Sequence, residues 1–189
     1  MSALIRMARA ADAAAIRAIY APHCERTFVS FETETPSAAA MAKRIASVQL
    51  RFPWLVLEEA GAVQGYSYAG AHHPRAAYAW SVDGAIYVRE GAQGRGIGRR
   101  LYQALFGLLR QQGIHTVCAQ IAVPNAPSVA LHLACGFTHV GTYTGVGWKF
   151  GGWRDVAHYQ LALQARAGEP RPVTPIGALV DLDTWRAQP

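Results

Sequence analysis

A glycine-rich turn between a predicted strand and a predicted helix constrains this chain more than any other feature of its sequence. It reads Gln93-Gly94-Arg95-Gly96-Ile97-Gly98 and is followed by Arg99-Arg100. Glycines at alternate positions let the main chain curl so that several N–H groups point to one spot. The positive end of the following helix faces the same spot, and arginine side chains can add charge-assisted hydrogen bonds. The turn therefore predicts a pyrophosphate site.

Two other phosphate-binding turns do not fit this spacing. A dinucleotide-binding turn has a longer gap before its third glycine, and an acidic residue follows about twenty residues later at the end of a strand. A P-loop needs Lys followed by Ser or Thr, whereas this turn is followed by Arg99-Arg100. A glycine-rich connection that binds nothing remains the alternative.

Length and composition indicate one globular domain. The chain has 189 residues, of which 51% are hydrophobic, enough for a full core. No apolar stretch is long enough to span a membrane, and no secretory signal is recognisable around Arg6 and Arg9. The sparse cysteines, Cys24, Cys118 and Cys135, are typical of free thiols in a reducing compartment. We therefore expect a cytoplasmic protein with no membrane partner.

The net charge of +6 does not by itself indicate nucleic-acid binding. The arginines form no long basic run, and no nucleic-acid-binding motif accompanies them. Their tightest group lies at the glycine-rich turn, where it suits a phosphate better than a duplex. No nucleic-acid partner is predicted.

The hydrophobic pattern predicts strands and helices in the order β-α-α-β-β-β-α-β-α-β-β. Sequential hairpins and two strand-helix-strand crossings favour an α/β domain whose mixed sheet carries helices on both faces. The predicted strands cover residues 4–7, 54–58, 63–69, 78–88, 116–123, 137–146 and 156–163. We expect the domain to span residues 1–163 and a Pro-rich tail, residues 164–189, to wrap a surface or a partner subunit.

Individual residues predict where several elements begin, end or bend. Asp12 and Ser37 are expected to cap the first two helices, Pro22 to end or bend the first, and Gly113 to end the third. The Asp83-Gly84 pair within a strand predicts a bulge or a close approach by another chain. Asn125 and Ser128 are both candidate caps of the last helix.

The pattern Gln-x-x-Gly-x-Gly after a strand resembles the acetyl-coenzyme A (acetyl-CoA) signature of the GNAT superfamily of N-acetyltransferases. Further segments resemble the phosphinothricin and methionine sulfoximine acetyltransferases within it. They are 30–34, 53–56, 65–70, 75–80, 124–128, 131–132, 149–156 and 171–176. The resemblance implies a GNAT-like domain with a twisted, mostly antiparallel sheet, acetyl-CoA as cosubstrate, and a small amino-acid-like amine as acceptor. It also implies a homodimer and a role in antibiotic or herbicide resistance.

The resemblance assigns the residues that hold acetyl-CoA. The turn residues Gln93, Gly94, Arg95, Gly96, Ile97, Gly98 and Arg99 are expected to hold the pyrophosphate. Main-chain groups of Ala85, Ile86, Tyr87 and Val88 are expected to bind the pantetheine as an added strand would. Asn125 and Ser128 are expected to bond the same arm, and for Asn125 a helix cap is the simpler alternative.

The resemblance also places a general base at Asp83, where the family usually has Glu. An amine attacks a thioester only as the free base, so a base must take a proton from the ammonium. Aspartate is one methylene shorter, so Asp83 would act through water, approach closely at a bulge, or only form an Asp-Gly turn. By the same resemblance, His132 is expected to be a second base or a relay, and a satisfied core residue is the alternative. Tyr87 is expected to protonate the leaving sulfur or to hydrogen-bond near the thioester, and an ordinary strand aromatic is the alternative.

A carboxylate or phosphinate on the acceptor needs a cationic partner. Arg75 and His73 are the candidates, with Tyr78 and Phe31 as walls and Asp83 near the amine. A solvated loop charge is the alternative for Arg75. No metal is predicted, because the histidines at 23, 72, 73, 115, 132 and 139 have no metal-ligand spacing, and neighbouring histidines on an extended chain point apart.

Other functions remain open at this stage. The acceptor could be another small amine or a peptide N-terminus. With aspartate in place of glutamate at 83, the chain could also be a coenzyme A-binding module without turnover.

Overall fold

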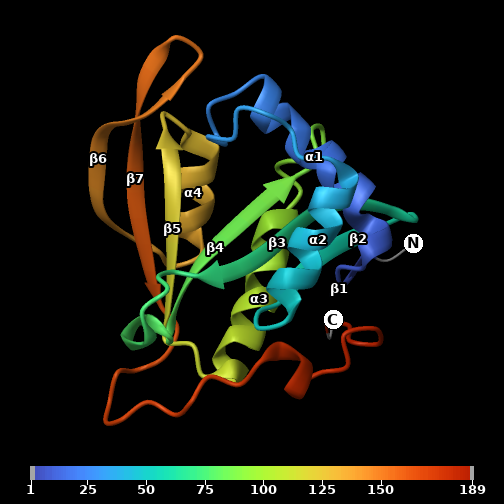
Figure 1. Ribbon diagram of the computed structural model, residues 1–189, viewed down its shortest axis with the longest axis vertical. Helices are drawn as coiled ribbons and strands as arrows, with labels where there is room; N and C mark the ends of the chain where they lie inside the picture. Colours follow the sequence, from blue (N-terminus) through green and yellow to red (C-terminus); the bar gives the residue numbers. More distant parts are fainter. Residues whose placement is uncertain (1–2, 188–189) are drawn as a thin grey trace.

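Seven strands and four α-helices make up the part of the chain that the computed structural model describes, residues 3–187 (Figure 1). The strands are β1 (Leu4–Met7), β2 (Trp54–Glu59), β3 (Ala62–Ala71), β4 (Ser81–Val88), β5 (Thr116–Val123), β6 (Thr138–Lys149) and β7 (Gly152–Ala162). The helices are α1 (Ala13–Glu25), α2 (Ala38–Gln49), α3 (Ile97–Gln112) and α4 (Ala126–Ala134). The order of elements is the one that the sequence predicts.

One sheet contains all seven strands, in the order β1-β2-β3-β4-β5-β7-β6. Its neighbouring strands are antiparallel except β4 and β5, which confirms the mixed, mostly antiparallel sheet. The parallel pairing joins only Ser81–Asp83 to Thr116–Cys118. Beyond Asp83 the two strands diverge, as Figure 1 shows. The sheet is therefore open between β4 and β5 on the side toward their carboxyl ends.

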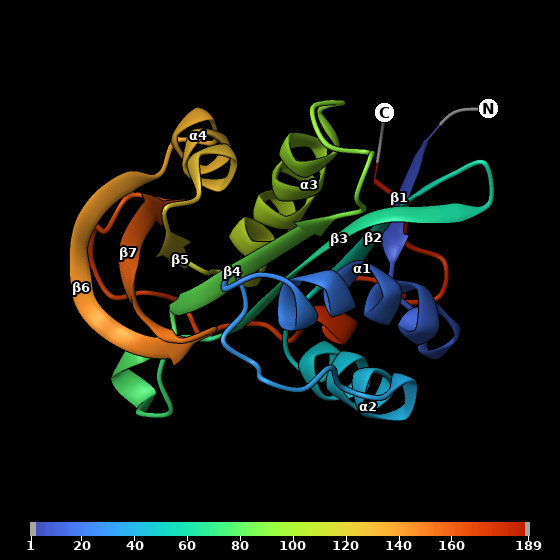
Figure 2. The same cartoon turned by 90° about the horizontal axis from the view of Figure 1, so that it is seen from above.

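Helices cover both faces of the sheet, as predicted (Figure 2). Because alternate residues of a strand face opposite sides, β2 divides its apolar side chains between two layers. Leu55 and Leu57 pack in the core beneath α3, together with Leu101 and Leu105 of that helix. Trp54 and Val56 pack in a second cluster with residues of α1 and α2.

Two predicted helix ends are confirmed. The hydroxyl of Ser37 accepts a hydrogen bond from the N–H of Ala40 at 3.1 Å and so caps α2. Gly113 ends α3 with a left-handed φ of 87°, which favours glycine.

Asp12 stands at the N-cap position of α1, as predicted, but its side chain makes no capping hydrogen bond to that helix. Its carboxylate instead accepts hydrogen bonds from the guanidinium of Arg6 at 2.7 and 2.9 Å and from the N–H of Arg9 at 2.7 Å. Pro22 also does not end α1, which continues to Glu25. A proline one turn from the end of a helix removes a single main-chain hydrogen bond, which this short continuation tolerates.

The bounds of the later strands differ from the prediction. β4 begins at Ser81 rather than at residue 78, because Ala76–Tyr78 forms a 3₁₀ turn. β6 and β7 form one long hairpin, which closes at Phe150 and Gly151 with φ of 51° and 70°. The glycines near this turn weaken the strand pattern in the sequence, so the prediction ended β6 too early and began β7 too late.

Gly84 marks a close approach rather than a bulge against β3. The β3–β4 register is unbroken from Gly65–Val88 to Ala71–Val82. A Cβ atom at Gly84 would lie 2.9 Å from Cγ1 of Val117 on β5. Glycine is therefore needed where β5 comes closest to β4, just before the strands part.

The segment that follows β7 packs along the domain itself. Ile176 is fully buried in the core cluster that includes α3, and Arg186 forms a β-bridge with Arg6 of β1. Gln112 of α3 donates hydrogen bonds from its side chain to the main-chain oxygens of Arg51 and Thr174. The described part of the tail is thus continuous with the core of the domain.

None of the helices in residues 3–187 combines the length and the apolar character needed to cross a bilayer.

The packing of the tail predicts its contribution to stability. Ile176→Ala removes a fully buried side chain, and we expect the free energy of unfolding to fall by about 2–4 kcal/mol. The matched control is Leu179→Ala, three residues later, whose side chain is 36% exposed and should cost less than about 1 kcal/mol. Urea unfolding followed by tryptophan fluorescence measures both. Equal small losses would show that the tail contributes nothing to the core.

Candidate active site

A groove lies beside β4 where β5 turns away. Residues 84–87 of β4 line one side, 120–122 of β5 the other, and residues 125, 128 and 132 at α4 close the end. Past Asp83, β4 has no strand beside it on this edge, so its main chain can bond an extended ligand as it would an added strand. Three of the predicted pantetheine-binding residues, Ala85, Ile86 and Tyr87, therefore line the groove, while Val88 does not.

The glycine-rich turn has the geometry of an anion site. Gly94 and Gly96 both have a φ of 76°, a left-handed conformation that favours glycine. The first main-chain bond of α3 runs from the N–H of Arg100 to the oxygen of Gly96 at 3.1 Å. The N–H groups of Ile97, Gly98 and Arg99 therefore have no acceptor within the helix and add to the positive end of its dipole.

The side chains of the turn have different partners. Gln93 accepts the N–H of Gly91 at 2.8 Å and thereby shapes the turn. Arg95 forms an ion pair with Glu59 at 2.6 Å, whereas the exposed Arg99 has no ion pair within residues 3–187. A guanidinium is thus available to an anion at Arg99 without loss of an existing ion pair.

Helix α4 closes the far end of the groove. Asn125 is its cap, because its side-chain oxygen accepts the N–H of Ser128 at 3.3 Å. Ser128 lies inside the helix, so Asn125 is the cap and Ser128 is not. A Cβ atom at Gly98 would lie 2.9 Å from Leu131, so this glycine lets the start of α3 approach α4 closely.

His132 of α4 is buried, and both its ring nitrogens are occupied. Nδ1 donates to the main-chain oxygen of Ser128 at 2.7 Å, so Nε2 accepts the hydroxyl of Tyr102 at 2.9 Å. Burial lowers the pKa of His132, which keeps the ring neutral. This arrangement is that of a satisfied core residue whose ring also lines the groove.

Tyr87 packs on the α1 side of the sheet. Its ring meets Tyr20 edge-on at 5.1 Å between centroids and stacks on Tyr66 at 5.2 Å. Burial raises the pKa of the Tyr87 phenol well above its ordinary value. The hydroxyl therefore stays protonated, as a proton donor must be.

Asp83 is paired with a histidine that the sequence reasoning missed as a functional residue. Nδ1 of His72 lies 2.7 Å from Oδ1 of Asp83. Burial raises the pKa of Asp83, and the hydrogen bond from His72 opposes that rise. The register that pairs Gly70 with Asp83 also puts His72 diagonally opposite it, and this register is the signal that could have identified His72.

A cavity of about 520 Å³, named here the acceptor cavity, lies next to this pair. Its lining comes from the loop between α1 and α2, from the end of β3 and from β5, β6 and β7. The residues are Phe31, His72, Cys118, Gln120, Val140, Tyr143, Val146, Val156, His158, Tyr159 and Gln160. Gln120 lines the groove as well, so the groove and the acceptor cavity meet there.

Phe31 is held in the acceptor cavity by contacts with β6. The ammonium of Lys149 donates hydrogen bonds to the main-chain oxygens of Ser30 at 2.6 Å and Glu32 at 2.8 Å, one on each side of Phe31. The Phe31 ring lies directly against Gly147, where a Cβ atom would collide with it. The predicted wall residue is thus fixed in place.

The other predicted acceptor residues lie outside the cavity lining. The rings of His73 and Tyr78 pack together at 4.7 Å between centroids, and Arg75 is exposed on the same loop. The structure therefore brings Phe31 into the lining of the cavity, and it links Asp83 to the cavity through its hydrogen bond with His72. His73, Arg75 and Tyr78 do not line the cavity.

His72, Asp83 and Cys118 each offer an atom that could bind a metal, and these atoms lie within 4.8 Å of one another. It is the one such group among the residues that the structure describes. Spacing along the chain could not indicate it, because the residues come from three strands or strand ends. One pair within the group, His72 and Asp83, is already hydrogen-bonded.

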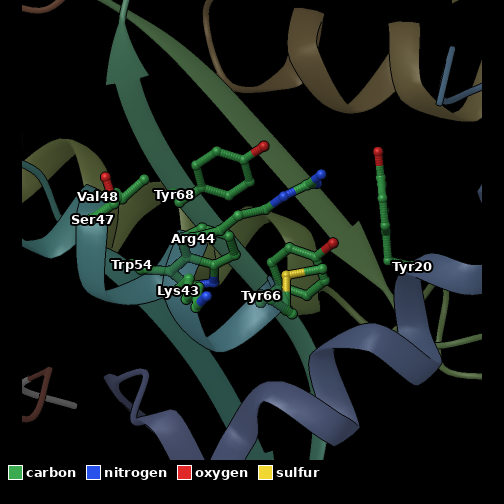
Figure 3. Close-up of a pocket in the computed structure, with 9 residues that line it drawn as sticks. Tyr20, Lys43, Arg44, Ser47, Val48, Trp54, Tyr66 and Tyr68 are labelled. Carbon is green, nitrogen blue, oxygen red and sulfur yellow. The ribbon is translucent and has the colours of Figure 1, made fainter. Parts of the chain in front are cut away.

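A second pocket of about 420 Å³ lies between α2 and strands β2 and β3 (Figure 3). Its floor is aromatic, with Tyr68 stacked on Trp54 at 4.1 Å between centroids. Figure 3 shows Arg44 extending from α2 across this pocket, where it forms an ion pair with Glu32 at 2.6 Å. The pocket shares no lining residue with the groove, whereas the acceptor cavity shares Gln120 with it.

Comparisons with known proteins agree with this geometry. The family model described as an acetyltransferase (GNAT) domain matches residues 5–157. A phosphinothricin N-acetyltransferase of Streptomyces viridochromogenes is 41% identical over 91% of this chain and 93% of its own length. An L-methionine sulfoximine/L-methionine sulfone acetyltransferase of Pseudomonas paraeruginosa is 37% identical over 90% of this chain and all of its own.

A solved structure shows the same fold. The crystal structure of a GNAT superfamily phosphinothricin acetyltransferase from Sinorhizobium meliloti in complex with AcCoA has a TM-score of 0.87 and 36% identity. The likeness covers 93% of this chain and 97% of that one. The matched family model, these relatives and the open sheet with its anion-binding turn show that this chain belongs to the GNAT family of acetyltransferases.

Proposed function

We propose that this protein transfers an acetyl group from acetyl-CoA to the α-amino group of a small amino-acid-like acceptor. The acceptor is of the phosphinothricin, methionine sulfoximine or methionine sulfone type that the relatives' names specify. The observation that carries the proposal is the meeting of the groove and the acceptor cavity at Gln120. A thioester in the groove and an amine in the cavity would be adjacent there.

The residues along the groove fit acetyl-CoA, which supplies an activated thioester when it is bound. The free N–H groups at the start of α3 and the Arg99 side chain suit the pyrophosphate. The unpaired edge of β4 at Ala85–Tyr87 suits the amide groups of the pantetheine. Ser128 offers a hydroxyl at the end of the groove.

Direct attack by the amine in a ternary complex is favoured over an acetyl-cysteine intermediate. Cys118 is the thiol in the acceptor cavity, and a nucleophilic cysteine must be a thiolate. Burial raises the pKa of Cys118, and the nearby Asp83 charge raises it further. The thiol is therefore kept protonated and weakly nucleophilic.

Arg75 is our candidate for the acceptor carboxylate or phosphinate. It is exposed and has no ion pair within the described residues, so its guanidinium can bind an anion without losing a partner. His73 and Tyr78 flank it on the same loop. The exposed position suits a group that contacts the acceptor at the edge of the cavity.

A homodimer is proposed as well, because the β6–β7 hairpin carries an exposed aromatic patch. We define the hairpin patch as Tyr143, Val146, Trp148, Phe150 and Trp153, each at least 53% exposed. β6 is also an edge strand of the sheet. Exposed apolar patches and open strand edges are covered in most native proteins, and a second copy of this chain would cover both.

The turn geometry predicts the effect of Gly96→Ala. Alanine disfavours the left-handed φ of 76° by about 1–2 kcal/mol, so the turn should relax and move the N–H groups away from the pyrophosphate. We expect the KM for acetyl-CoA to rise about tenfold, equivalent to about 1.4 kcal/mol. The control is Gly107→Ala within α3, where an added Cβ meets open space and KM should not change. Equal KM values in both variants would reject the turn as the pyrophosphate site.

The proposed reaction is tested by coenzyme A release, detected with a thiol reagent. L-phosphinothricin, L-methionine sulfoximine and L-methionine sulfone are offered beside plain amino acids and a peptide. We expect Asp83→Asn to lower kcat by about 100-fold or more. Asp83→Glu retains a carboxylate and should keep kcat within about tenfold of the wild type. Arg75→Ala should raise KM about tenfold, and only for acceptors that carry an acidic group.

Three results would contradict this proposal. Turnover of the peptide alone would indicate an N-terminal acetyltransferase. Tight acetyl-CoA binding without turnover of any amine would indicate a binding module. Full activity of Asp83→Asn would remove the carboxylate from the mechanism.

The hairpin patch predicts the oligomeric state. We expect a dimer by size-exclusion chromatography with light scattering, and a monomer for Trp153→Glu, because a charge on the patch opposes its burial. Leu50→Glu is the control, since Leu50 at the end of α2 is even more exposed, at 75%, but lies on another element. A wild-type monomer would refute the dimer, and a dimer in both variants would place the interface elsewhere.

A further inference from the structure

The hydrogen bond between His72 and Asp83 determines which nitrogen of the imidazole is free. A carboxylate only accepts hydrogen bonds, so Nδ1 of His72 carries the proton that it shares with Oδ1 of Asp83 at 2.7 Å. Nε2 is then left with its lone pair. The side chains are 33% and 39% exposed, so neither is sealed from a ligand.

Of the two residues, His72 is the one that reaches the acceptor cavity. It belongs to the lining of the cavity, whereas Asp83 is not among the lining residues. Asp83 and Cys118 face each other as the last residue pair before β4 and β5 part, and Gln120 of the groove follows two residues later on β5. An amine that approaches the groove from the cavity therefore meets the imidazole before it meets the carboxylate.

We infer that His72, held by Asp83, is the base that takes the proton from the acceptor ammonium. The inference rests on the proposed acetyl transfer and assigns within it a catalytic residue that the family resemblance leaves unassigned. An imidazole extends the reach of the short aspartate side chain by a ring. Histidine is also the side chain that most often serves as a general base.

The protons balance through this pair. An ammonium nitrogen loses two protons when it becomes an amide, and the departing sulfur of coenzyme A takes one when the C–S bond breaks. The other passes to Nε2 of His72 before the nitrogen attacks the carbonyl carbon. Asp83 stabilises the resulting imidazolium, which then releases its proton to solvent through the exposed side of the ring.

Several charged or polar groups surround His72. Asp83 on β4 is the carboxylate in contact with it, and the thiol of Cys118 on β5 lies within 4.8 Å of the pair. His158 of β7 also lines the cavity. Its charge lowers the pKa of Asp83, but this effect is smaller than those of burial and of His72. Tyr78 meets the His72 ring edge-on at 6.0 Å between centroids. Of these groups, the Asp83 carboxylate is the one that is hydrogen-bonded to the ring.

Two substitutions at His72 separate a base from a positioning residue. Asparagine in His72→Asn can donate to Asp83 in place of Nδ1–H but offers no basic nitrogen, whereas His72→Phe removes both functions. We expect kcat to fall about 100-fold in both variants, with the KM for acetyl-CoA unchanged. Both variants should also lose the fall in kcat toward acid pH that we expect in the pH profile of the wild type. His115→Asn, the same change at the start of β5, is the control and should leave kcat and the profile unaltered.

The other outcomes are distinguishable. If His72→Asn is active and His72→Phe has lost activity, His72 only positions Asp83 and the inference is overturned. Full activity of both variants would overturn it as well. Loss of wild-type activity with EDTA and its return with Zn²⁺ would assign His72, Asp83 and Cys118 to a metal site instead. A wild-type protein that acetylates no amine would reject the proposed function itself. An active His72→Asn variant would reject only the assignment of His72 as the base. Thermal stabilisation by acetyl-CoA checks that each variant is folded.

Discussion

The parallel pairing of β4 with β5 ends after Asp83 and Cys118, and the site depends on this early ending. Gly84 lets β5 approach β4 closely just before the strands part, since a side chain at this position would collide with Val117. Once the strands part, one edge of β4 has no strand beside it while the β3 edge stays fully paired. A sheet that leaves main-chain groups unpaired in its middle is costly unless a ligand or water satisfies them. The open edge therefore marks the ligand groove.

The same divergence brings distant segments to one place. The crossover from β4 to β5 is α3, so the start of this helix and its free N–H groups lie at the carboxyl end of β4. On the opposite side of the opening, β6 and β7 curve past β5, and Lys149 holds the loop that carries Phe31. The cosubstrate groove and the acceptor cavity are therefore two sides of one gap in the sheet.

The sequence predicted best what local chemistry decides. The glycine-rich turn, the cap at Ser37 and the end of α3 at Gly113 depend on φ values and hydrogen bonds within a few residues. Asp12 stands at the predicted N-cap position, but its side chain does not cap α1, because it pairs with Arg6 of β1, which also binds Glu58 of β2. The assignment of Asn125, Arg75 and the turn residues to ligands stays a prediction. The pairing of His72 with Asp83 was missed, because it requires the register of a hairpin rather than a motif.

That pairing gives a physical reason for the short carboxylate at position 83. The Oδ1 atom of Asp83 lies 2.7 Å from Nδ1 of His72, so the imidazole extends the reach of the aspartate. A glutamate on this strand would carry its own carboxylate about one bond length further. If His72 is the base, as proposed, aspartate with histidine and glutamate alone are two ways to place a base at the same point. Under that mechanism, the basic group that faces the amine is an imidazole in this chain and a carboxylate where glutamate stands alone.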